Sequence, residues 1–106
     1  MKKIEYSTLF KRHFKSRIAR RKKLLFIYKM VLRKFAKSPE HPDLKNHYLR
    51  DKMKGFRSFT IDDDCRVIYK ETEKSYLFYD IGTHQQVYKK KRIKKMNDEF
   101  YKENHQ

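Results

Sequence analysis

The chain has 106 residues, and its 29 lysines and arginines outnumber its 13 aspartates and glutamates, which gives a formal net charge of +16 at pH 7. A chain of this length is expected to form one domain, 1–106, with its eight phenylalanines and eight tyrosines supplying a small core. The charge favours an anionic partner, and nucleic acid ranks ahead of a membrane because the sequence has no long apolar segment or secretory signal.

The N-terminal part of the sequence predicts a short strand followed by two helices. Ile4 and Tyr6 alternate with polar residues in the strand, and Ser7 is a suitable cap for the first helix, which is expected to run to about Ala19. The second helix is expected over residues 22–37 and ends at Ser38-Pro39, because the residue before a proline disfavours helical geometry. The apolar positions of the two helices are Phe10, Phe14 and Ile18 in the first and Leu24, Tyr28, Val31, Leu32 and Phe35 in the second.

This helical region is basic throughout. Between Tyr6 and Pro39 there are twelve lysines and arginines and no acidic residue, whereas ordinary solvated helices mix both signs. A helical face of this kind needs counter-charges from elsewhere, which either RNA phosphate or an acidic protein partner would supply. Its basic members are Lys11, Arg12, Lys15, Arg21, Lys22, Lys29 and Lys37.

The remainder of the chain changes to the alternation that is typical of strands. Residues 39–54 are expected to be a loop with one helical turn, and three strands follow over 56–61, 65–72 and 75–83, joined by short polar hairpin connections. The expected fold is α+β, with the two-helix hairpin packed on an antiparallel sheet of about four strands. The single cysteine, Cys65, is expected to be a buried or half-buried strand residue, and it excludes an intramolecular disulfide. Residues 89–106 form a basic C-terminal extension, either a short helix or a disordered tail.

The three consecutive aspartates before Cys65 are not expected to bind a metal ion. On an extended chain their side chains alternate in direction, so they cannot converge on one cation. Asp62 and Asp63 are expected to form the hairpin turn. Asp64 is assigned instead to a functional site, on the same strand face as Arg66.

RNA offers this protein a chemistry that needs neither metal nor cofactor. The ribose 2′-hydroxyl attacks the neighbouring phosphate when a base removes its proton, an acid protonates the leaving 5′ oxygen, and cations stabilise the phosphorane. His84 is the best candidate for proton transfer, because it follows the third strand directly and Gly82 permits a sharp exit from that strand. Arg66, in the middle strand, is suited to holding the phosphate.

Residues 47–88 resemble the RelE/YafQ family of bacterial toxins, and the YafQ branch most closely. The resemblance rests on the order and spacing of "KGFRSFTI", an aspartate, "RVIY" and "IGTH", with an aromatic residue four positions after the histidine. It implies a messenger-RNA interferase of a type II toxin–antitoxin module, which acts on the ribosome in the bacterial cytoplasm and is neutralised by an antitoxin encoded alongside. The partners so implied are an acidic antitoxin, the ribosome and messenger RNA.

The same resemblance suggests roles for individual residues. It matches His84 to the principal catalytic histidine, His47 to a second histidine ahead of the strands, Asp64 to an acidic residue, and Arg66 to a phosphate-binding arginine. It also places Tyr88 at the RNA, and the further basic residues assigned to RNA binding are Lys52, Lys54, Arg57, Lys89, Lys90 and Lys91. Thr60 stands where YafQ-like sequences usually have histidine, so the proton acceptor is left open between His47 and Asp64, or the reaction relies more on Arg66 with Lys52 or Lys54.

Two other functions compete with RNA cleavage. One is inhibition of DNA gyrase, as in the ParE branch of the same superfamily, and the other is RNA binding without catalysis, which the charge alone would support. The "IGTH" motif and Arg66 favour cleavage, because ParE-like proteins generally lack that histidine.

Overall fold

The computed structural model describes residues 2–88. The basic extension over residues 89–106, with Lys89, Lys90 and Lys91, lies outside this range. The elements follow the order β1 (Lys3–Tyr6), α1 (Thr8–Arg17), α2 (Lys22–Lys37), β2 (His47–Tyr48), β3 (Arg57–Thr60), β4 (Cys65–Glu71), β5 (Ser75–Thr83) and α3 (His84–Val87). Two single 3-10 turns, Pro42–Leu44 and Asp51–Met53, lie on either side of β2.

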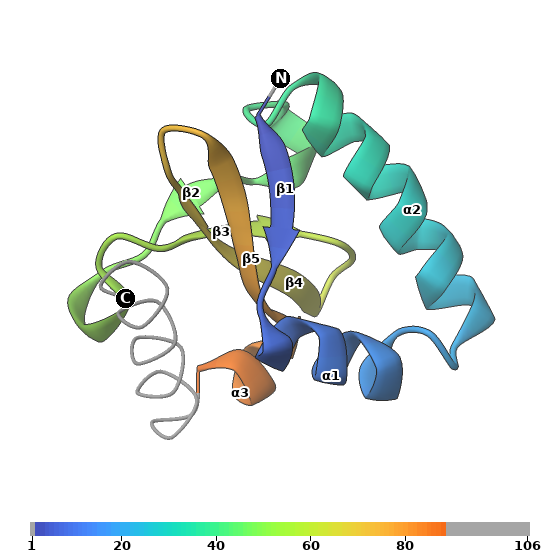
Figure 1. Cartoon of the computed structure of the whole chain (residues 1–106). Coiled ribbons are helices and arrows are strands. Elements are labelled where there is room, and N and C mark those ends of the chain that lie inside the picture. Colours follow the sequence, from blue (N-terminus) through green and yellow to red (C-terminus); the bar gives the residue numbers. More distant parts are fainter. Residues whose placement is uncertain (1, 89–106) are drawn as a thin grey trace.

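The strands form one sheet in the order β1-β5-β4-β3-β2 (Figure 1). The α+β class is as predicted, but the sheet has five strands and is mixed, because β1 pairs in parallel with β5. The additional strand, β2, consists of two residues that pair with β3, in a segment where the local pattern predicts only a loop. Strands β2 to β5 form the expected antiparallel arrangement.

Helix α1 begins where the sequence predicts. After β1 ends, it is α1 that lies next to β5. The Ser7 hydroxyl oxygen accepts a hydrogen bond from the Phe10 N–H and donates to the Tyr79 carbonyl oxygen at 2.8 Å, so one residue both caps α1 and ties it to β5. Helix α2 ends before Ser38, as expected. In Figure 1, α2 rises steeply away from α1, so the two helices are not packed side by side along their lengths. Neither is long and apolar enough to cross a bilayer, and the same is true of every helix within residues 2–88.

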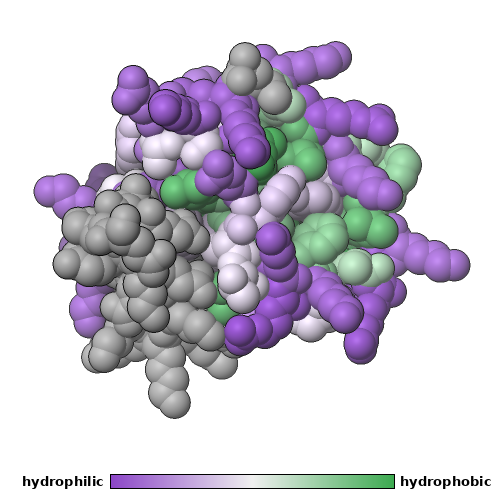
Figure 2. All heavy atoms as spheres, viewed as in Figure 1, coloured by the Kyte–Doolittle hydropathy of each residue, from purple (hydrophilic) through white to green (hydrophobic). Residues whose placement is uncertain are grey.

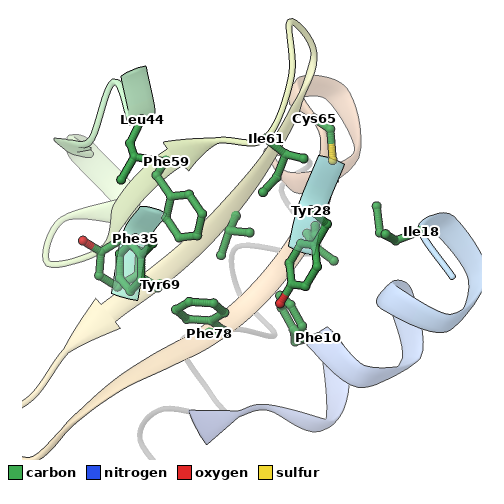
Figure 3. Packing of buried hydrophobic residues seen from close by; sticks show 12 residues of the cluster. Phe10, Ile18, Tyr28, Phe35, Leu44, Phe59, Ile61, Cys65, Tyr69 and Phe78 are labelled. Carbon is green, nitrogen blue, oxygen red and sulfur yellow. The ribbon is translucent and has the colours of Figure 1, made fainter. Parts of the chain in front are cut away.

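The main core lies between the helices and one face of the sheet (Figure 3). Phe35 of α2 is fully buried at its centre, with its ring centroid 4.6 Å from that of Phe59 and 5.5 Å from that of Phe78. Aromatic pairs at these separations add to the free energy gained from burial alone. Cys65 is buried at the edge of this core, as expected for its strand position.

A second cluster of buried side chains covers the other face of the sheet. Its centre is made by Phe56, Ile68 and Tyr79, and Val87 of α3 packs against it. Alternate residues of β4 therefore enter different cores, since Val67 belongs to the first cluster and Ile68 to the second. This burial on both faces explains why "RVIY" reads as a nearly continuous apolar run.

Candidate active site

His84 is the first residue of α3 and follows β5 without a linker. The turn is fixed by a capping box in which the Thr83 hydroxyl oxygen accepts from the Gln86 N–H, and the Gln86 side-chain oxygen accepts from the Thr83 N–H. His84 is exposed, and its ring centroid lies 4.6 Å from that of Tyr88 in an edge-on arrangement. The histidine and the aromatic residue of the motif are therefore brought together at the end of a rigid strand.

Two side chains approach the backbone of Gly82. A Cβ atom at this position would lie 2.6 Å from Arg17 Nη1 and 2.6 Å from Gln86 Oε1, closer than side-chain carbons approach such atoms. The glycine of "IGTH" thus makes room for the cap of α3 and for an arginine from α1, so that both can fix the strand end that carries His84.

Arg66 lies next to this strand end. In the register of the sheet it is opposite Gly82 on β5 and opposite Thr60 on β3. Its Nε atom is buried and has no hydrogen-bond partner within residues 2–88. Because directly opposite residues share a face of the sheet, the guanidinium group lies on the same face as Thr60.

Asp64 is positioned by the turn that precedes β4. The Asp62 side chain accepts hydrogen bonds from the N–H groups of Asp64 and Cys65, which confirms the prediction that Asp62 belongs to the hairpin turn. Asp64 itself lies before the strand, differing from the expectation that it shares a strand face with Arg66. Cys65 pairs with Thr83, so Asp64 and His84 are the two residues immediately beyond that pair.

Asp64 also contributes to a groove of about 710 Å³ between the connection from α1 to α2 and the strand end that carries His84. Thr83 and Gln86 line the same groove from the start of α3, and Cys65 lies in it. Burial raises the pKa of the Cys65 thiol to about 12, so this sulfur is protonated at neutral pH and is not a nucleophile.

His47 lies on the edge strand β2, away from His84. It is opposite Ser58, which places it on the sheet face of Thr60 and Arg66, one row further along. Its Nδ1 atom lies 2.9 Å from the Lys45 carbonyl oxygen, so Nδ1 carries the proton in that contact. Three strand spacings separate β2 from β5, roughly 14 Å in all, which is more than the two imidazoles can bridge around one phosphate.

Arg57 does not join the predicted RNA contacts. Its position opposite Tyr69 turns it to the helical side of the sheet, where its residue is buried to 8% exposure. There it donates to Glu40 Oε1 and Asn46 Oδ1, each at 2.9 Å, and its guanidinium carbon lies 4.2 Å from the Tyr48 ring centroid. The structure gives Arg57 a structural role that links β3 to the preceding loop.

The predicted lysines lie in the turn that precedes β3. Lys52 and Lys54 are both exposed, and positive φ angles at Asp51 (55°) and Gly55 (94°) form the two ends of this turn. A further lysine that the sequence pattern did not single out, Lys70 of β4, lies with its Nζ atom 4.9 Å from the Phe56 ring centroid. Burial lowers the pKa of the Lys70 ammonium group.

Sequence reasoning also missed a buried group of charged residues behind the site. His13 Nδ1 lies 2.6 Å from Asp80 Oδ1, and Arg17 Nη1 lies 3.7 Å from the same oxygen while donating to the Ile81 carbonyl oxygen at 2.9 Å. Asp80 is fully buried. The sequence did contain a signal for this buried group. Two basic residues lie four positions apart on the apolar side of α1, and one aspartate lies inside an apolar strand. Within residues 2–88, no three histidine, cysteine or acidic side chains gather as metal ligands would.

The chain matches the family model described as "Bacterial toxin of type II toxin-antitoxin system, YafQ" over residues 2–89. No curated protein sequence matches it. Among solved structures, YafQ from E. coli strain BL21(DE3) is 27% identical, with a TM-score of 0.71 over 84% of this chain and 100% of that chain.

Two further solved structures are similar. The E. coli DinJ-YafQ toxin-antitoxin complex contains a chain that is 30% identical, with a TM-score of 0.64 over 83% of this chain and 98% of that one. A metal-bound toxin from Helicobacter pylori is 27% identical, with a TM-score of 0.65 over 83% of this chain and 100% of that one. The chain therefore belongs to the YafQ family of bacterial toxins of type II toxin–antitoxin systems.

Proposed function

We propose that this toxin is a ribosome-dependent endoribonuclease that cleaves messenger RNA by metal-independent attack of the ribose 2′-hydroxyl, in the bacterial cytoplasm. The observation that carries the proposal is the arrangement at the end of the β4–β5 hairpin. There Asp64 directly precedes Cys65 and His84 directly follows Thr83, the last residue pair of the two strands, and Arg66 lies opposite Gly82 in the adjacent pair. Proton transfer and charge neutralisation of a phosphate can be performed from one strand end.

In this mechanism Arg66 donates hydrogen bonds to the oxygens of the scissile phosphate. The 2′ oxygen forms a bond to phosphorus as Asp64 accepts its proton, and the bond from phosphorus to the 5′ oxygen breaks as His84 donates a proton to that oxygen. The products are a 2′,3′-cyclic phosphate and a free 5′-hydroxyl. Negative charge that builds on the phosphorane is stabilised by the guanidinium group.

The other residues of this sheet face are assigned to RNA binding. The Thr60 hydroxyl, opposite Arg66, can donate to the same phosphate, although it cannot replace an imidazole in proton transfer. His47, Lys52 and Lys54 contact neighbouring parts of the strand, and Tyr88 stacks on a base beside His84. Binding of this kind weakens steeply as salt is added, because phosphate contacts release counterions.

An acidic antitoxin is the proposed protein partner. The support is the chain's net charge of +16, together with the DinJ-YafQ complex, in which a similar toxin is bound to an antitoxin. Such a partner would supply the counter-charges that residues 7–39 lack.

The test is to induce wild-type protein and a His84→Gln variant and to map the 5′ ends of messenger RNA, with and without an inhibitor of translation initiation. His84→Gln should reduce cleavage at least about 100-fold, as expected for a general acid. His41→Gln is the matched control, because His41 lies in the loop after α2, where its Nδ1 accepts from the Asp43 N–H. Full cleavage by His84→Gln would refute the assignment. Inhibited gyrase supercoiling without new 5′ ends would favour the ParE-like function.

A further inference from the structure

Helix α2 carries two exposed apolar side chains on the side that faces away from the core. Phe26 is 64% exposed and Met30 is 53% exposed. Four residues separate them, so they are neighbours on one side of the helix. At 100° per residue this side lies opposite Tyr28 and Phe35, which are buried in the main core. Single exposed apolar residues are ordinary, but an adjacent pair of large ones is typical of a contact surface.

Cations continue the line of this apolar pair in both directions along α2. Lys22 precedes Phe26 by four residues, and Arg33 and Lys37 follow Met30 by three and seven. All three are exposed, and within residues 2–88 the α2 cation with an ion pair is Lys34, bound to Asp43. Figure 2 shows hydrophobic atoms at the surface among hydrophilic side chains on the side of the molecule where α1 and α2 lie.

We propose that the outer side of α2 is the docking surface for an acidic amphipathic helix of the cognate antitoxin, an inference that rests on the partner proposed above. Apolar side chains of that helix cover Phe26 and Met30, and its carboxylates pair with Lys22, Arg33 and Lys37. This surface carries only positive charge, because no acidic residue occurs between Tyr6 and Pro39 to compete for these cations, and it is therefore complementary to an acidic partner.

The apolar pair is what distinguishes a protein from RNA as the occupant. Phosphates would satisfy the cations equally well, and a base could stack on Phe26. The flexible thioether of Met30, exposed by 53% at the centre of the line, gives no flat surface for a base. Methionine is instead common at protein-binding surfaces, where it adapts to apolar side chains of the partner.

The residues to be substituted on this surface are separate from the proposed catalytic residues. Phe26, Met30 and Arg33 are absent from the lining of the groove that contains Asp64 and Thr83, whereas Lys22 lines it. In Figure 1 the outer side of α2 faces away from β4 and β5, at whose shared end α3 begins. Substitutions on it should therefore weaken antitoxin binding without changing RNA cleavage.

The experiment compares wild-type toxin with a Phe26→Ser/Met30→Ser double variant and an Arg33→Glu variant. The probe is the purified acidic protein encoded beside the toxin gene, titrated calorimetrically into each toxin. Removing two apolar contacts should raise Kd by about 100-fold or more, and the charge reversal by about tenfold. Lys74→Ser is the matched control, because Lys74 is an exposed lysine in the turn between β4 and β5, outside α2. Its Kd should equal that of the wild type.

The proposal would be overturned if both variants bound the antitoxin with a Kd within twofold of the wild type. If the variants bound the ribosome more weakly while that Kd was unchanged, the surface would be assigned to RNA instead. Unaltered melting temperatures show that the variants are folded, since the substituted side chains lie outside the core. In a growth assay the double variant should still inhibit growth but escape rescue by the antitoxin. If the wild type did not cleave RNA, the proposed function would fail while the binding measurement still tested this surface.

Discussion

Removing the buried carboxylate of Asp80 should destabilise the protein severely. Its Oδ1 atom accepts from the Ile81 N–H at 2.8 Å and lies 2.6 Å from His13 Nδ1, with Arg17 Nη1 at 3.7 Å. Asp80→Ala would leave two basic side chains with 6% and 15% exposure facing an apolar methyl group. Removing one member of a buried pair costs about 3–5 kcal/mol, against a total stability of roughly 5–15 kcal/mol for a domain.

The prediction can be checked by urea unfolding monitored by far-UV circular dichroism. The wild type and Asp80→Ala should differ by about 3–5 kcal/mol in the free energy of unfolding, which corresponds to a loss of at least about 12 °C in Tm. Glu71→Gln is the control, since it breaks a surface ion pair with Lys2 and should cost no more than about 1 kcal/mol. If Asp80→Ala cost as little as this control, the charged group would not stabilise the fold as described.

Three further predictions concern the end of β4 and β5 at which α3 begins. Gly82→Ala would place a Cβ atom 2.6 Å from Arg17 Nη1, so the bond from Arg17 to the Ile81 carbonyl oxygen should be lost at a cost of roughly 1.5–3 kcal/mol; unchanged unfolding in urea would contradict this. Iodoacetamide at pH 8 should label Cys65 only after unfolding, because burial raises the thiol's pKa from its ordinary 9.0 to about 12. The stability that this raised pKa contributes is complete below pH 9 and is lost as the pH rises through 12, so Cys65→Ala should lose less stability than the wild type over that interval. Native labelling as fast as labelling in guanidinium would refute the burial argument.

The elements that the sequence predicted correctly are those specified by neighbouring residues. Ser7 and Ser38-Pro39 fix helix ends through local hydrogen bonding and sterics, and the alternating runs of β3 to β5 have hairpin connections a few residues long. Strand β2 escaped prediction because two residues carry no periodicity, and their pairing with β3 depends on the turn that lies between them. The parallel pairing of β1 depends on a strand about seventy residues away, which no local pattern specifies.

Part of the candidate site was also predicted correctly, because that part too is specified by neighbouring residues. His84 and Tyr88 are four residues apart on one short helix, so the spacing of the motif already places the two side chains close together. The environment of Arg57 depends on register, because a shift of one residue would have turned it to the face of Arg66. The group of His13, Arg17 and Asp80 joins α1 to β5, and only the tertiary structure brings its members together.

The parallel pairing of β1 with β5 also affects how the protein is made. Lys3 lies opposite Ser75 and Tyr6 opposite Phe78, so within residues 2–88 the strand that is synthesised first pairs with the one synthesised last. Until β5 has left the ribosome, β1 has no edge to join, and the strand end that presents His84 does not exist. Contacts this distant in the chain also fold slowly, because a long loop must close before they form. The sheet is therefore complete only after nearly all of residues 2–88 have been synthesised, and the candidate site forms no earlier.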